Sequence, residues 1–206
     1  MINRRRVQGR PVAEPDLRSV WTGHLALPDE PLWPEETRLL PRGWTLDAGL
    51  PEILAPFLGS PPRDRADLVR FTGVSGDAAT RLLEVLPPLT LDWRHNLAPT
   101  TRSLLAAAAH RPDDVQIAGF AIGPGRSDEG ISITTAFVRD THGFRVAPAP
   151  WTGDDADDEW HPEWCECADL SLWVQAEYGL DQLVGPDELT PGGSWDDHET
   201  WRLWWD

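Results

Sequence analysis

The stretch VQIAGFAIGPGRSDEGISITTAFV, residues 115–138, carries the clearest secondary-structure signal in the chain. Two runs rich in β-branched and aromatic residues, 115–122 and 131–138, flank the turn-forming sequence GPGRSDEG. In the second run isoleucine and phenylalanine alternate with smaller or polar residues, which is the pattern of a half-buried strand. We therefore predict an antiparallel β-hairpin at this position.

The segments around this hairpin predict further strands and helices. In the hairpin loop we expect Arg126 to pair with Asp128 or Glu129, and we expect GFRVAP, 143–148, to add a third strand to the meander. Apolar periodicity and capping residues predict the other elements. These are a strand at ADLVRFTG, 66–73, a short helix at LPEILAPFLG, 50–59, and longer helices at SGDAATRLLEVLP, 75–87, TTRSLLAAAAHRP, 100–112, and ADLSLWVQAEYGL, 168–180.

Our most detailed prediction concerns the helix at 168–180. We predict that Asp169 caps it, that Leu172, Trp173 and Ala176 form its buried face, and that Gly179 ends it. Together the elements indicate an α+β fold in which helices pack against a small antiparallel sheet.

The chain of 206 residues is long enough for one substantial domain. We predict a disordered basic N-terminus over 1–16 and a single α+β domain over 17–206, of which 151–206 is an acidic, tryptophan-rich C-terminal region. The first twenty residues lack the apolar run of a secretory signal, and no apolar stretch is long enough to span a membrane. The expected location is the cytoplasm, which agrees with a chain that has two cysteines.

Negative charge is concentrated in the second half of the chain. Residues 112–206 contain 4 Arg against 21 Asp and Glu, and the whole chain has a net charge of -16. Such a field repels phosphate backbones and anionic lipids, so we exclude nucleic acid and membrane as direct ligands. It attracts cationic proteins, cationic small molecules and divalent metals.

A metal site is one hypothesis for the stretch DDADDEWHPEWCEC, 154–167. His161, Cys165 and Cys167, with His198 or an acidic residue as a fourth ligand, are residue types that can bind zinc. The spacing is unlike the usual zinc pattern, which pairs cysteines two to four residues apart with a second such pair. We therefore expect no bound cofactor and keep zinc as an alternative. A disulfide between these cysteines would close across one residue and be strained.

The sequence contains few groups of residues that could form a catalytic site. The sequence DWRHN, 92–96, places Asp92, His95 and Asn96 between two helices, where side chains able to do acid–base work often serve function. A polar turn uses the same residue types. An acid–base or metal-assisted enzyme that uses Asp92, His95 and His161 is therefore the alternative hypothesis.

The preferred hypothesis is a binding protein. Eight of the twelve tryptophans lie in residues 151–206, and aromatic faces beside carboxylates suit a cation such as arginine or lysine. We predict a non-enzymatic protein that covers a basic surface on a partner protein, with an immunity- or antitoxin-like inhibitor as the concrete version. A zinc-stapled adaptor domain is a further alternative, and the sequence leaves the oligomeric state open. The predicted partner-binding residues are Asp154, Asp155, Asp157, Asp158, Glu159, Trp160, Glu163, Trp164, Trp204 and Trp205.

Overall fold

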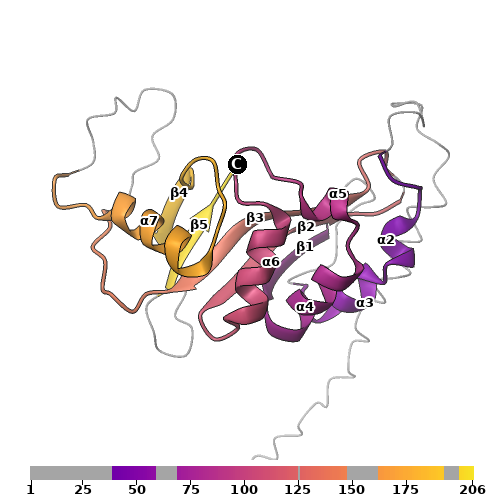
Figure 1. Cartoon of the computed structure of the whole chain (residues 1–206), viewed down its shortest axis with the longest axis horizontal. Helices are drawn as coiled ribbons and strands as arrows, with labels where there is room; N and C mark the ends of the chain where they lie inside the picture. The colour runs from indigo at the N-terminus through magenta and orange to yellow at the C-terminus, as the bar shows by residue number, and fades with distance from the viewer. Residues whose placement is uncertain (1–38, 59–68, 125, 148–161, 193–199) are drawn as a thin grey trace, which may run out of the picture.

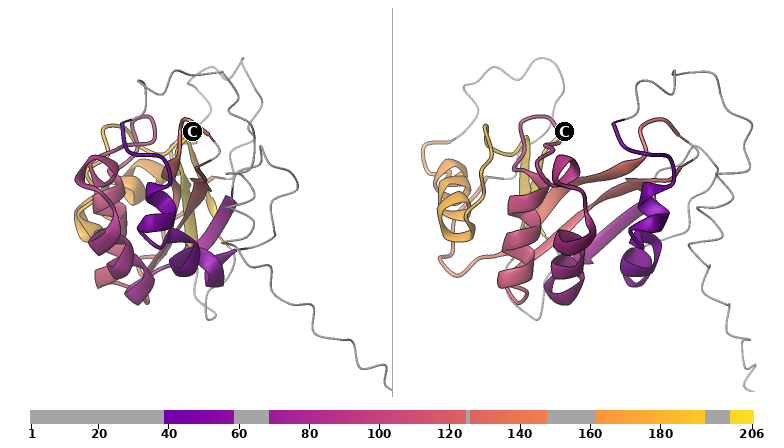
Figure 2. Two further views of the ribbon diagram at one scale, coloured as in Figure 1. Left: turned by 90° about the vertical axis from the view of Figure 1, so that its right-hand side faces the viewer. Right: turned by 45° about the vertical axis from the view of Figure 1, so that its right-hand side comes forward.

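A five-stranded antiparallel sheet forms the centre of the molecule, in the strand order β1-β2-β3-β5-β4. The computed structural model describes residues 39–58, 69–124, 126–147, 162–192 and 200–206. Helices α4, α6 and α7 lie on one side of the sheet (Figures 1 and 2), so the α+β prediction is confirmed.

The elements follow one another as helices α2 (Trp44–Asp47) and α3 (Leu50–Leu54), the 3-10 helix η2 (Ala55–Phe57), β1 (Val69–Val74), α4 (Gly76–Val85), α5 (Pro88–Leu91), α6 (Thr101–His110), β2 (Val115–Ile122), β3 (Gly130–Arg139), α7 (Cys167–Tyr178), β4 (Glu188–Pro191) and β5 (Thr200–Trp204).

The β2–β3 hairpin agrees with its prediction. The two strands pair in antiparallel register, and in the loop between them Arg126 and Asp128 form an ion pair at 2.7 Å. The register shifts at Gly119, because Ala118 pairs with Thr135 while Gly119 pairs with Ile133. Thr134 is thus the extra residue of a β-bulge on β3.

The predicted third strand at 143–148 is wrong, since residues 143–147 carry no strand. The position beside β3 belongs instead to β5, which comes from the far end of the chain. The physical reason lies in the two sequences. β5 and the residue after it bury Trp201, Leu203 and Trp205, whereas GFRVAP starts with glycine, ends with proline and offers less apolar area.

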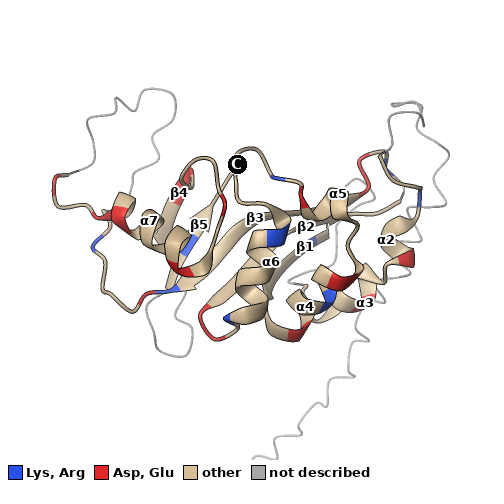
Figure 3. Ribbon diagram, in the orientation of Figure 1, with Lys and Arg blue, Asp and Glu red and all other residues tan. Residues whose placement is uncertain are grey.

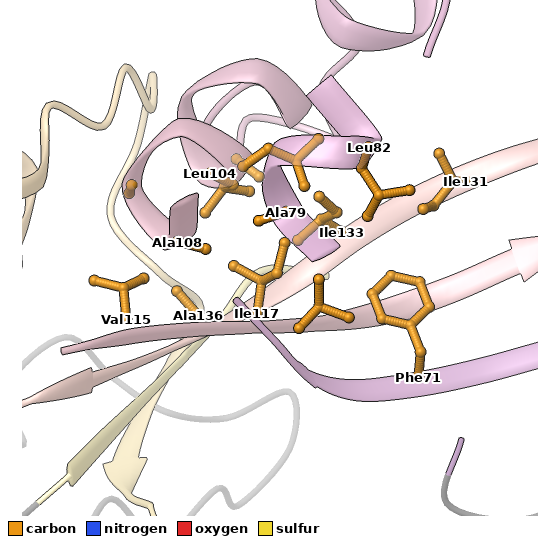
Figure 4. Close-up of a cluster of buried hydrophobic side chains, with 14 of the residues drawn as sticks. Phe71, Ala79, Leu82, Leu104, Ala108, Val115, Ile117, Ile131, Ile133 and Ala136 are labelled. Atoms are coloured by element: carbon orange, nitrogen blue, oxygen red, sulfur yellow. The ribbon is translucent and has the colours of Figure 1, made fainter. Parts of the chain in front are cut away.

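The side of the sheet that faces α4 and α6 is apolar (Figure 4). The core that fills this interface is aliphatic and aromatic, and its helices present small and branched residues to the strands. The labelled members in Figure 4 are Phe71, Ala79, Leu82, Leu104, Ala108, Val115, Ile117, Ile131, Ile133 and Ala136.

Helix α7 occupies the predicted segment and ends at Gly179, whose φ of 64° is the left-handed conformation that glycine adopts without strain. Its predicted buried face is wrong for Leu172 and Ala176, which are exposed, whereas Trp173 is partly buried and packs against the core. The residues in the core are Leu170, Val174 and Tyr178, one turn apart, while Leu172 is 63% exposed. The residue before the first turn is Glu166, so Asp169 lies inside the helix and is not its cap.

Several parts of the predicted fold lie outside the described residues. Among them are the disordered N-terminus over 1–16 and the beginning of the strand predicted at 66–73, of which residues 69–74 form β1. Within the part of the chain that the structure describes, no helix is long and apolar enough to cross a membrane.

Candidate binding surface

Two loops meet beside the end of β5. One joins α5 to α6 (92–100) and the other joins α7 to β4 (179–187). The backbone amide of Leu183 donates to the carbonyl of Leu97 at 3.0 Å, and the Arg94 guanidinium donates to the carbonyls of Ala98 and Asp181. We call this pair of loops, with the residues they expose, the loop-pair surface.

The carboxylate of Asp181 fastens the second loop to the start of α6. It accepts hydrogen bonds from the amide of Thr100 at 2.7 Å and from the hydroxyl of Ser103 at 2.6 Å, and it forms an ion pair with Arg94 at 3.0 Å. Thr100 is also the N-cap of α6, where its side chain accepts from the amide of Ser103. One carboxylate therefore braces both loops and a helix end.

This network sets the charge state of Asp181. Partial burial pushes its pKa up, but hydrogen bonds from Ser103 and Thr100 and the charge of Arg94 outweigh that effect. The pKa of Asp181 is therefore below its ordinary value, and the carboxylate stays ionised at neutral pH.

The loop-pair surface exposes large apolar side chains. Trp93 is 54% exposed, Leu97 49%, Leu183 65% and Val184 45%. They make up four of the nine exposed large hydrophobic residues in the described ranges, and they lie on two short loops. Clustered exposed apolar groups on a braced framework are typical of interaction sites.

The end of β5 adds acidic groups to this surface. Asn96 donates from its side chain to the carbonyl of Asp206, and the amide of Asp206 donates to the carboxylate of Asp187 at 2.9 Å. Asn96 has a φ of 48°, a left-handed conformation that asparagine tolerates better than most residues. Figure 3 shows acidic positions at both ends of α7 and at β4. The apolar side chains thus lie among carboxylates.

The described residues of the predicted enzyme site, Asp92, His95 and Asn96, have separate hydrogen-bond partners, and His161 lies outside the described residues. Asp92 is paired with Arg102 at 2.8 Å, and Asn96 holds the end of β5. The Nδ1 atom of His95 lies 2.9 Å from the hydroxyl of Ser132, and its ring packs edge-on against Phe120. Ser132 is a buried residue of β3, so this contact fixes the loop to the sheet.

The predicted partner-binding residues have different environments. Glu163 and Trp164 are exposed before α7, while Trp204 is half-buried with the Arg202 guanidinium 5.7 Å from its ring centre. Trp205 is 1% exposed and belongs to the core, so it is not accessible to a partner. The remaining members lie outside the described residues: Asp154, Asp155, Asp157, Asp158, Glu159 and Trp160.

The structure describes only some of the residues predicted to bind zinc. Cys165 and Cys167 are described, whereas His161 and His198 lie outside the described residues. Among the residues with a described position, no group of three or more His, Cys, Asp or Glu side chains is arranged to hold a metal ion.

Comparison with known proteins gives no further guidance, since no family model, curated protein or solved structure matches the chain.

Sequence reasoning missed Asp181, Leu97, Leu183 and Ser132. A signal was present for Leu183, because Leu183 and Val184 are apolar residues in the polar run DQLVGPDE, where a core position is not expected. The role of Asp181 depends on contacts with residues about eighty positions away, which no local pattern reveals.

A second hydrogen-bonded carboxylate behaves like Asp181. Asp140 accepts from the indole of Trp201 at 2.9 Å and from the backbone amides of His142, Gly143 and Phe144. Burial pushes the pKa of Asp140 up, but these four donors outweigh it and the pKa lies below its ordinary value. The bonds connect the end of β3 to β5.

These two carboxylates predict a loss of stability in acid. A folded-state pKa below the unfolded value near 3.8 gives stability that is present above that pH and is lost as the pH falls through the folded pKa. We expect Asp181→Asn to cost about 1–2 kcal/mol at neutral pH through its lost charged hydrogen bonds. Urea denaturation at neutral pH and between about pH 4 and 2 measures both effects.

The matched control for this prediction is Asp113→Asn, which changes an exposed carboxylate with no hydrogen bond recorded in the described part of the chain. The Asp181→Asn protein should lose less free energy of unfolding on acidification than the unaltered protein, whereas Asp113→Asn should follow the unaltered protein. Equal acid sensitivity of Asp181→Asn and the unaltered protein would contradict a lowered pKa of Asp181 in the folded protein.

Proposed function

We propose that this protein is a non-enzymatic binding protein that covers a basic surface of a partner protein, with an immunity- or antitoxin-like inhibitor as the concrete version. The observation that carries the proposal is the loop-pair surface, on which Trp93, Leu97, Leu183 and Val184 stand exposed among carboxylates. The acidic C-terminal half of the chain supports the same conclusion.

The chemistry of this surface specifies the partner. Apolar side chains provide the affinity when a partner removes them from water, at about 25 cal/mol for each Å² buried. The net charge of -16 raises the encounter rate with a basic partner and repels an acidic one. The fitting partner therefore carries apolar side chains within a field of arginine or lysine.

The bracing of the two loops also favours binding. The Asp181 network and the Leu183–Leu97 backbone bond hold the loops before any partner arrives. A surface that is already ordered loses little conformational entropy on association, which increases affinity.

The alternative, an enzyme based on Asp92 and His95, has weaker support. Its two described side chains have separate partners, since Asp92 pairs with Arg102 and His95 contacts Ser132. General acid–base catalysis requires such groups to reach one reacting centre together.

A direct test uses synthetic peptides as probes. Three immobilised peptides of equal length would alternate Arg with Leu, Arg with Ser, and Glu with Leu. We expect the protein to bind the Arg–Leu peptide most tightly, with an affinity that falls as salt rises. The double change Leu97→Ser and Leu183→Ser should weaken this binding about tenfold or more, since each buried leucine contributes about 1.5–3 kcal/mol. Biolayer interferometry measures both.

The chain offers a matched control in Leu172→Ser, because Leu172 is as exposed as Leu183 but lies on α7. This variant should bind the Arg–Leu peptide like the unaltered protein. Equal weakening by Leu172→Ser would indicate unspecific adhesion, and unchanged affinity of the double variant would exclude the loop-pair surface. Equal binding of the Glu–Leu peptide would exclude a basic partner.

A further inference from the structure

The two cysteines of the chain lie in contact at the start of α7. Cys167 is the first residue of the helix and Cys165 lies two positions earlier. Their side chains share a hydrogen bond, and neither residue is disulfide-bonded. Both are partly exposed, so small molecules in solution can reach them. Two accessible thiols in contact form a vicinal dithiol.

The backbone between the cysteines is turned and not extended. Glu166, the residue before α7, has φ -98° and ψ 24°. Glu166 is itself fixed, since its amide donates to the carbonyl of Arg145 at 2.8 Å and its carboxylate accepts from the Arg145 amide at 2.7 Å.

A further contact fixes Cys165. The amide of Ala147 donates to the Cys165 sulfur at 3.3 Å, so residues 145–147 run beside the cysteine pair and hold it. Residues 145–147 therefore hold both Cys165 and the residue between the two cysteines.

From this geometry we propose that Cys165 and Cys167 form a reversible redox site, which closes to an intrachain disulfide by exchange with a low-molecular-weight disulfide. One thiolate attacks a sulfur of the small disulfide RSSR and displaces RS⁻, which leaves a mixed disulfide on the protein. The second cysteine attacks the protein sulfur of that bond and displaces the other RS⁻. The dithiol is oxidised by two electrons, RSSR is reduced to two RSH, and the two thiol protons pass to the two RS⁻ groups.

The small ring makes the site reversible. A disulfide across one residue is strained, and strained, exposed disulfides are more easily reduced than structural ones. The pair therefore fits a switch better than a permanent crosslink.

The thiol form is the resting state in a reducing environment. Burial, and secondly the contact with Cys165, raise the pKa of Cys167 above its ordinary value. Exchange proceeds through the thiolate, so it requires an excess of the small disulfide or an alkaline solution. This inference uses residues apart from the loop-pair surface and is independent of the proposed function.

The test incubates the full chain with excess oxidised glutathione at about pH 8.5, where more of the thiol is ionised. The reaction is then quenched with acid, and intact-protein mass spectrometry follows. We expect the unaltered protein to lose the mass of two hydrogens, to retain no glutathione, and to regain both hydrogens in dithiothreitol. The variants Cys165→Ser and Cys167→Ser should each accumulate one stable glutathione adduct, because no second thiol is present to displace it.

Each other outcome overturns the proposal. Stable glutathione adducts on the unaltered protein would mean that the second thiol cannot close the ring. Disulfide-linked dimers would mean that closure between chains is preferred, and two unreacted thiols would mean that the pair is inert. Thermal denaturation of both serine variants checks that they are folded, so that an adduct is not the product of an exposed, unfolded cysteine.

Discussion

The substitution Gly119→Ala is expected to destabilise the protein by about 3 kcal/mol or more. Gly119 lies at the bulge of the β2–β3 hairpin, where a Cβ atom would lie 2.0 Å from the carbonyl oxygen of Ser132 and 2.9 Å from the Cα of Ile133. Both are backbone atoms of the neighbouring strand, so no side-chain rotation relieves the overlap. Either β2 and β3 separate locally, which breaks ladder hydrogen bonds, or the bulge rearranges.

Gly130→Ala is the matched control, because it makes the same change at the start of β3. A Cβ there would lie 3.6 Å from the Asp128 carbonyl oxygen, which is an ordinary contact. We expect Gly130→Ala to alter the free energy of unfolding by less than about 1 kcal/mol. Urea denaturation followed by circular dichroism compares the two variants. Equal stabilities would show that the close approach of β3 to Gly119 does not constrain the hairpin.

The hairpin shows how far the sequence can predict this fold. Alternation and turn residues predict both strands because those signals are local. The requirement for glycine at position 119 comes from the opposite strand and becomes visible only with the register. The neighbour of β3 on its other side depends on competition between distant segments, which the sequence leaves open.

The loop-pair surface is harder to predict for the same reason. Asp92, His95 and Asn96 were identified as polar residues between two helices, and that position is confirmed. Their partners Arg102, Ser132 and Asp206 lie ten, thirty-seven and one hundred and ten residues away. Residue types indicate what a side chain can do, whereas the fold decides which group it meets.

The substitution Trp205→Ala gives the second large expected effect, a loss of about 3–5 kcal/mol. Trp205 is 1% exposed and its amide donates to the carbonyl of Thr134 at the bulge. Truncation to alanine leaves a large cavity beside β3. The alternation of buried Trp201, Leu203 and Trp205 with half-buried Arg202 and Trp204 is a strand signal in WRLWW that sequence reasoning did not use.

The indole nitrogen of Trp205 makes the prediction more specific. Its N–H is buried without a hydrogen-bond partner among the described residues, and an unpaired buried donor costs about 1–3 kcal/mol. Phenylalanine keeps an aromatic ring and removes that donor. We therefore expect Trp205→Phe to lie within about 1 kcal/mol of the unaltered protein, because the lost volume and the relieved donor offset one another.

The adjacent Trp204→Ala is the control for Trp205→Ala. Trp204 is half-buried on the other side of β5 and contacts Arg202, so its truncation should cost about 1 kcal/mol. Urea denaturation should rank the free energies of unfolding with Trp205→Ala far below Trp204→Ala, and with Trp205→Phe near the unaltered protein. A larger loss for Trp204→Ala would mean that β5 presents its opposite side to the core. That result would overturn the register of β5 against β3, and with it the position of Asp206 beside Asn96.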